Sequence, residues 1–275
     1  MRKTFVLCAL LVPAVAMADE CKYSEPRELK LKLDGIKSVL LDVQQNTIKL
    51  TGNGNGNGIS ELRGSACASD ADMLKELTVH QRRDGDTLVV TLRQEGTIHG
   101  INQGNHYAYL NMAGNVPANL QVQLRLGSGN ADIGSVASLE ARVGSGDLHA
   151  SAINGPVTVT VGSGEVELHG IGSLTMPTLG SGDGTVTQVG GDVKVGNVGP
   201  GDLSVHNVHG NVQIDSVGSG NVRLNDVTGN VALHSIGSGN LGLDNIGGNL
   251  SVQRTGSGDI HQRGVRGNVH LPKPR

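Results

Sequence analysis

Aromatic residues are scarce in this 275-residue chain, which has no tryptophan, one phenylalanine and three tyrosines. Phe5 lies in the first 18 residues, and Tyr23, Tyr107 and Tyr109 all precede residue 127. Sugar-binding surfaces favour aromatic rings, whose flat apolar faces cover the sugar. The C-terminal half therefore lacks the side chains on which such surfaces usually depend.

Long apolar runs are also missing, apart from one at the start of the chain. Arg2 and Lys3 precede an apolar stretch at residues 4–16, and small residues flank Met17. This pattern predicts a secretory signal peptide at residues 1–18, cleaved after Ala18, and the stretch is too short for a membrane span. Acidic residues directly before Cys21 disfavour a lipoprotein. We expect a periplasmic or secreted protein of a Gram-negative bacterium, with no transmembrane segment.

The mature chain has no excess of positive charge and few cysteines. Without Arg2 and Lys3, 20 basic residues face 25 acidic ones, a net charge of −5, which argues against nucleic acid as a partner. Cys8 leaves with the signal peptide, so Cys21 and Cys67 remain as one pair in an oxidising compartment. We expect them to form a disulfide; two separate buried thiols are the alternative.

Glycine is abundant, with 42 residues, and its spacing is regular. From residue 127 onward the repeats settle to a period of 19, and self-similarity at this length predicts a solenoid. Gly199-Pro200-Gly201 replaces one copy of the Gly-Ser-Gly triplet. The triplets begin at Gly127, Gly144, Gly162, Gly180, Gly218, Gly237 and Gly256.

Each repeat contains two short alternating segments. After the triplet at Gly218, Val222 and Leu224 flank Arg223, and after a second turn Val231 and Leu233 flank Ala232. Alternation predicts strands, and the Gly-Asn pairs predict turns. We therefore expect an all-β fold, a single-chain β-solenoid (β-helix) of about eight turns of 17–19 residues over residues 127–275, with an aliphatic interior.

Polar residues recur at both corners of the predicted turn. Asparagine tolerates left-handed backbone conformations and can hydrogen-bond along a stack, so these residues predict structural ladders. One corner carries the ladder Asn211, Asn230, Asn249 and Asn268, preceded by Asp192. The other carries Asn130, Asp147, Glu165, Asp183, Asp202, Asn221, Asn240 and Asp259.

Calcium is the alternative reading of the acidic corner, because a divalent cation would relieve stacked like charges. The Gly-Gly-x-Gly-x-Asp spacing of calcium-binding arrays is nevertheless missing. The histidines of the repeats fall at different offsets in neighbouring turns, so no zinc site is expected. We predict no metal, no cofactor and no catalytic residue. Motifs for nucleophilic hydrolases, zinc proteases, phosphate loops and Cys-x-x-Cys redox centres are all missing from the sequence.

Residues 19–126 are less regular and predict a β-rich cap for one open end of the solenoid. Residues 37–52 and 86–95 are typical of strands. The glycine-rich segment at residues 52–58 predicts a hairpin between residues 48–50 and 59–62. A short helix is expected to begin at Ser69, with Asp72 completing the capping box.

Val116-Pro117 before an alternating strand, followed by Gly-Ser-Gly-Asp/Asn units, resembles the bacterial putative-adhesin family of β-strand-repeat proteins, related to the head GIN domain. The resemblance covers residues 39–270 and implies an exported β-solenoid with the role of an adhesin. The resemblance carries over no catalytic residues. We expect an exported, non-enzymatic protein of the cell envelope that is adhesin-like or acts as a scaffold or binding protein. A polysaccharide-active lyase or hydrolase-like β-helix is the alternative.

The sequence predicts an unknown envelope component or glycan as partner and leaves the oligomeric state open. Basic residues gather near its end, where Asp259 is the one acidic residue after position 250. This charge either blunts the last edge against end-to-end stacking or contacts an anionic glycolipid. The basic residues are Arg254, Arg263, Arg266, Lys273 and Arg275.

Overall fold

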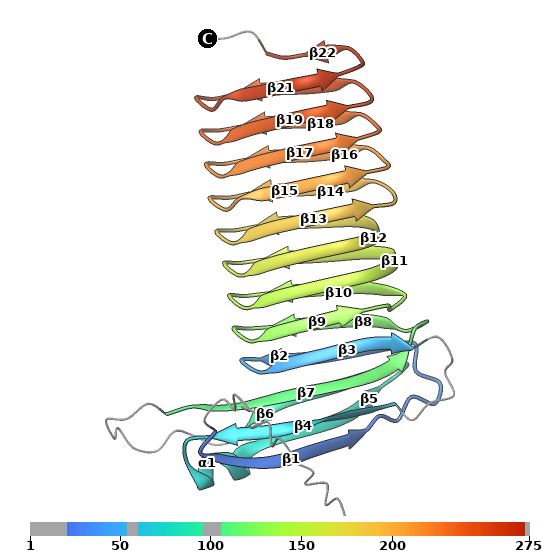
Figure 1. Cartoon of the computed structure of the whole chain (residues 1–275), viewed down its shortest axis with the longest axis vertical. Helices are drawn as coiled ribbons and strands as arrows, with labels where there is room; N and C mark the ends of the chain where they lie inside the picture. Colours follow the sequence, from blue (N-terminus) through green and yellow to red (C-terminus); the bar gives the residue numbers. More distant parts are fainter. Residues whose placement is uncertain (1–20, 54–59, 96–105, 273–275) are drawn as a thin grey trace, which may run out of the picture.

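The computed structural model describes residues 21–53, 60–95 and 106–272, and within them the chain forms a tall stack of strands on a broader base (Figure 1). The signal peptide predicted at residues 1–18 lies outside the described residues. Each layer of the stack is one turn of the coil, with two short strands joined by corners. The predicted all-β solenoid of about eight turns is confirmed.

The coil has two faces, and consecutive strands alternate between them. Face one contains the strand after each Gly-Ser-Gly corner, and face two contains the strand after each Gly-Asn corner. Two long strands, β11 (Asp147–Val161) and β12 (Glu165–Leu179), bend around a corner and serve both faces. Face one also includes β9 (Asn130–Gly134), β13 (Asp183–Val189), β15 (Leu203–Val208), β17 (Asn221–Val227), β19 (Asn240–Ile246) and β21 (Ile260–Val265). Face two also includes β8 (Gln121–Leu126), β10 (Ser138–Val143), β14 (Val193–Val198), β16 (Val212–Val217), β18 (Val231–Ile236), β20 (Leu250–Thr255) and β22 (Val269–His270).

Strands on one face pair in parallel with equivalent residues aligned. In β17, Val222 pairs with Leu203 in the layer before it and with Leu241 in the layer after it. In β17 three aliphatic side chains point inward, Val222, Leu224 and Val227, and each is at most 1% exposed; most strands of the coil repeat this pattern. Burying one such side chain contributes about 1.5–3 kcal/mol, so stacked aliphatic columns hold the coil together.

The inward residues of face one follow a two-then-three spacing because one residue between them has a left-handed backbone. Asp226 has φ 57°, and this conformation leaves two consecutive outward residues before Val227 turns back into the core. Gly170 occupies the equivalent place in β12 with φ +64°. Among the described residues, the non-glycine residues at positive φ on face one are Ser135, Ala152, Gln188, Asn207, Asp226 and Asn245, and Gln44 near the base also has a positive φ.

Glycine at the Gly-Ser-Gly corners serves a different need, which is close backbone approach. A Cβ added at Gly220 would lie 1.9 Å from the carbonyl oxygen of Gly201 in the preceding turn. Gly220 has no positive φ. The second glycine of this triplet is therefore required by contact between turns and not by backbone conformation.

The base of the stack is made from the N-terminal region. Its strands β6 (Thr87–Gln94) and β7 (Ala108–Pro117) continue the parallel stack, whereas β1 (Tyr23–Lys30), β4 (Glu61–Ala68) and β5 (Leu77–Asp84) add antiparallel partners below it. Helix α1 (Ala71–Glu76) lies beside them. Among the described residues, no helix has the length and apolar character needed to cross a membrane. The predicted cap at Ser69 is wrong by one residue, because Asp70 is the N-cap and its Oδ1 accepts the Asp72 N–H at 2.8 Å.

An early segment of the chain forms the layer between this base and the rest of the coil. Strands β2 (Ser38–Gln44) and β3 (Thr47–Asn53) pair in parallel with β6 and β7 on one side and with β8 and β9 on the other. The hairpin predicted between residues 48–50 and 59–62 is therefore wrong, since β4 pairs with β1 and β7. Residues 54–59 of that expected turn lie outside the described residues.

A fully buried asparagine holds the corner between β2 and β3. Asn46 is 0% exposed, and its Nδ2 donates to the carbonyl oxygens of Val43 at 3.0 Å and Leu92 at 3.2 Å. Its Oδ1 accepts the Leu110 N–H at 2.8 Å. One side chain therefore joins the intercalated layer to the end of β6 and the beginning of β7.

Candidate interaction surfaces

Outward side chains form columns along the coil, because equivalent positions lie above one another. On face one, neighbours within a column contact each other in several places. His149 Nδ1 lies 2.8 Å from Glu167 Oε2, and His169 Nδ1 lies 2.8 Å from Thr187 Oγ1. Lys49 pairs with Asp132 at 2.6 Å near the base. These contacts fix the outward side chains relative to each other.

The Gly-Asn corner carries the residues expected as a ladder. Asn230 Oδ1 accepts the Asn249 N–H at 2.8 Å, and Asn249 Oδ1 accepts the Asn268 N–H at 2.8 Å. Asn211 accepts from Asn230 in the same way at 2.9 Å. The amide oxygen of each asparagine thus satisfies a backbone N–H of the next turn.

Asp192 occupies the first of these ladder positions and is the charged member. Its Oδ1 accepts the backbone N–H of Asn211 at 2.8 Å and the Asn211 side-chain amide at 3.2 Å. These hydrogen bonds, the backbone one first, lower the pKa of the Asp192 carboxyl from its ordinary value. The folded corner therefore favours the ionised aspartate.

The acidic corner uses the same type of contact. Asp183 Oδ1 accepts the Asp202 N–H at 3.1 Å, and Asp202 Oδ1 accepts the Asn221 N–H at 2.9 Å. Backbone donors thus compensate the stacked carboxylates. In the part of the chain that the structure describes, no three histidine, cysteine, aspartate or glutamate side chains gather as a metal site would need.

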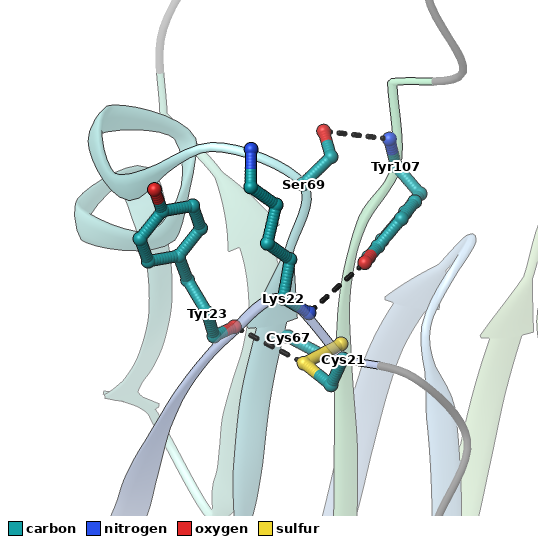
Figure 2. Close-up of a disulfide and its surroundings, with 6 residues drawn as sticks. All are labelled: Cys21, Lys22, Tyr23, Cys67, Ser69 and Tyr107. Atoms are coloured by element: carbon teal, nitrogen blue, oxygen red, sulfur yellow. Dashed lines mark hydrogen bonds between the residues drawn. A yellow bond between two sulfur atoms is a disulfide. The ribbon is translucent and has the colours of Figure 1, made fainter.

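The disulfide lies in the base, between the start of the described chain and β4. Cys21 and Cys67 are bonded, with Cα atoms 5.7 Å apart (Figure 2). Next to it, the Lys22 N–H donates to the Tyr107 hydroxyl at 3.1 Å, and the Tyr107 N–H donates to Ser69 Oγ at 3.2 Å. Ser69, expected as a helix cap, thus ties β7 to the β4–α1 connection.

The basic residues at the C-terminal end are partly compensated. Arg263 Nε donates to Asp244 Oδ1 at 3.2 Å, and the two residues lie one 19-residue period apart, so the stacking of turns brings them together. Arg254 contacts His234 of the preceding turn. Of the other three basic residues expected here, Arg266 is exposed, and Lys273 and Arg275 lie outside the described residues. β21 pairs with β19, and Val269 and Leu271 remain 43% and 37% exposed at this end.

Several shallow grooves interrupt the columns, and two of them on the coil lie beside arginines. One, of about 350 Å³, lies on face one around Gly242, with Arg223 and His261 in the strands on either side. The other, of about 390 Å³, lies beside the aligned pair Arg125 and Arg142 near the base. Sequence reasoning missed both, although an outward glycine inside a strand was a visible signal for the first.

No family model matches the chain, and no curated protein matches it. Solved structures do: a putative adhesin from Parabacteroides merdae is 11% identical, covering 87% of this chain and 96% of its own, with TM-score 0.48. A putative lipid binding protein from Parabacteroides distasonis is 18% identical, covering 90% and 97%, with TM-score 0.47. A putative cell adhesion protein from Clostridium sporogenes is 13% identical, covering 88% and 100%, with TM-score 0.31.

Proposed function

We propose that this chain is an exported, non-enzymatic binding or scaffold protein of the bacterial cell envelope, in the manner of an adhesin, and that it belongs to the putative-adhesin β-strand-repeat family. The observation that carries the proposal is the pairing of outward side chains from one turn to the next. Such a rod presents polar groups at a fixed spacing of about 4.8 Å over its length. Repeat proteins use extended surfaces of this kind to bind partners.

Export is supported by two independent features of the chain. The signal-peptide pattern at residues 1–18 addresses it to the secretory route. The Cys21–Cys67 disulfide suits an oxidising compartment, and the periplasm or the exterior provides one. The partner is proposed to be an envelope component or a glycan.

The polysaccharide-active enzyme stays the alternative, and it makes a different demand on the surface. Acid and base side chains must converge on one bond, usually in a cleft built by long loops. In the described turns, outward acids such as Glu167 and Asp244 are already held by His149 and Arg263. This arrangement favours binding over cleavage.

The test expresses the whole chain in a Gram-negative host and separates its compartments. We expect an exported form that begins at Asp19, whose mass shows no free thiol, and that retains envelope components in a pull-down. Retention in the cytoplasm with residues 1–18 intact would contradict export. Release of reducing ends or unsaturated products from a polysaccharide panel would establish the enzyme instead.

A further inference from the structure

Gly242 is an outward residue in the middle of β19, and the backbone does not require glycine there. A Cβ at this position would lie 3.8 Å from Arg223 Cγ and 3.9 Å from the Val222 carbonyl oxygen, which is ordinary contact. Its φ is not positive. Glycine inside a strand weakens it and often marks a place where a ligand approaches the backbone closely. Gly242 thus differs from Gly220, where the preceding turn leaves no room for a side chain.

The missing side chain opens the column between two basic neighbours. Arg223 lies one strand before Gly242 and His261 one strand after it, so their Cα atoms are about 9.6 Å apart. Asn225 and the Asp244–Arg263 pair lie in the adjacent column. The resulting groove of about 350 Å³ is at the lower end of the ~300–1,000 Å³ range of small-ligand pockets.

The groove holds one uncompensated guanidinium. Arg263 is engaged by Asp244, whose pKa that guanidinium lowers by hydrogen bonding, so these two charges cancel. Within the described part of the chain, Arg223 makes no hydrogen bond or ion pair with another side chain, and it is exposed. Arginine binds carboxylates through two parallel hydrogen bonds, and these are stronger than the hydrogen bonds of neutral donors because the guanidinium is charged.

We propose that the groove at Gly242 binds a carboxylated sugar of an acidic polysaccharide, with Arg223 contacting the carboxylate and His261 and Asn225 contacting hydroxyl groups. This proposal rests on the proposed binding function and names its ligand class. The lack of aromatic residues in the coil favours a charged sugar over a neutral one, because a guanidinium can provide the attraction that ring stacking would otherwise provide. The open groove favours a unit within a longer chain over a small free anion, which would stay hydrated.

The probe is a trimer of galacturonic acid, titrated calorimetrically into the purified exported protein at low ionic strength. We expect it to bind at least about tenfold more tightly than a galactose trimer, since hydrogen bonds to a charged group are the stronger ones. Added salt should weaken binding of the acidic trimer and leave binding of the galactose trimer unchanged. Equal affinity for the two trimers, or no detectable binding of the acidic one, would overturn the proposal.

Two variants test the groove itself. Arg223→Gln should weaken trigalacturonate binding about tenfold. Gly242→Thr should weaken it as much by filling the groove, while stability stays equal or rises, because threonine favours strands and meets no clash. Ala232→Thr places the same side chain in β18 on face two and is the matched control. Unchanged binding by Gly242→Thr, or equal loss by Ala232→Thr, would contradict the assignment.

The other basic groove and lipid surfaces are separate arms of the test. Arg125→Gln should leave trigalacturonate binding unchanged, and a loss there as large as that of Arg223→Gln would move the site to face two. Vesicles containing phosphatidylglycerol should not bind through Arg223; if they do while the trimer does not, the sugar assignment is wrong. Export and envelope pull-down do not depend on Gly242, so this inference can fail while the proposed function stands.

Discussion

The distance between successive turns is set at single residues, and the second glycine of each Gly-Ser-Gly corner is the most constrained. At Gly220 an added Cβ would lie 1.9 Å from a backbone oxygen, whereas at Gly218, two residues earlier, the nearest atom would be 3.3 Å away. Backbone atoms on both sides are fixed by parallel pairing, so they cannot move apart locally. Two glycines of one triplet therefore differ in what they tolerate.

We predict that Gly220→Ala lowers the free energy of unfolding by about 2–3 kcal/mol, as overpacking does, and that Gly218→Ala costs about 0.5 kcal/mol. Denaturant unfolding of the two variants measures the difference. Equal costs would mean that the corners relax more easily than the contacts between turns imply.

Asn46 is the corresponding residue in the base. Asn46→Ala would leave the Leu110 N–H and the Leu92 carbonyl oxygen buried without these partners. We expect a loss of about 2–4 kcal/mol, because each buried unpaired group costs about 1–3 kcal/mol. Asn46→Asp keeps an acceptor for the Leu110 N–H but loses the two donors, so its denaturant midpoint should be lower than that of wild type. A midpoint for Asn46→Ala within error of wild type would show that water replaces the side chain.

Elements are held together by two kinds of link, the corner ladders of the coil and the covalent bridge of the base. In the ladder, Asp192 is ionised and accepts from Asn211, so its folded pKa is below its unfolded value of about 3.9. A depressed pKa stabilises the fold above the unfolded pKa. This contribution is lost as the pH falls through the lower folded pKa.

We therefore predict that Asp192→Asn, which keeps the acceptor oxygen, makes stability less sensitive to acid below about pH 4. Urea midpoints of wild type and variant should converge as the pH is lowered from about 6 to about 3. A constant difference between the two midpoints over that pH range would show that protonation of Asp192 makes no contribution to stability.

The bridge closes a sequence separation of 46 residues. Replacing Cys21 and Cys67 by serine should destabilise the base by up to about 4 kcal/mol on the chain-entropy estimate. Hydrogen exchange should then quicken in β1 and β4 while β15 to β19 stay protected. Loss of protection throughout the coil would show that base and coil unfold as one unit.

The sequence indicated the coil because its contacts recur at a nearly constant separation, which leaves a visible period. Pairings at irregular separations left no such period. Strands β2 and β3 lie between strands that come much later in the chain, and Ser38, for example, pairs with both Thr87 and Gln121. For this reason the hairpin predicted from the local glycines was wrong. Asn46 was missed for the same reason, since its partners Leu92 and Leu110 lie 46 and 64 residues later in the chain. The pairing of Asp244 with Arg263 instead follows the 19-residue period, so stacking of the predicted turns already implied it. The outward glycine in β19 was visible in the sequence, but the sequence alone does not distinguish a glycine required by neighbouring turns from one that is free to change, as Gly242 is.

The whole molecule is a one-dimensional stack above its base, so its stability is carried by contacts between neighbouring turns. Residues 218–236 form one complete layer, with β17 on face one and β18 on face two. Without them, β19 would stack on β15 and β20 on β16 with aliphatic columns and corner residues aligned. Without residues 218–227 alone, β18 would follow β16 directly and each later strand would change face.

The most direct test of this architecture compares these two deletions by exported yield and cooperative unfolding followed by circular dichroism. Removal of residues 218–236 should leave a folded protein that is slightly less stable, because every remaining interface is preserved. Removal of residues 218–227 should give aggregated or degraded protein, because Gly-Ser-Gly corners would then stack on Gly-Asn corners. Equal tolerance of the two deletions would contradict the two-strand turn, and with it the fixed faces on which the proposed binding surface depends.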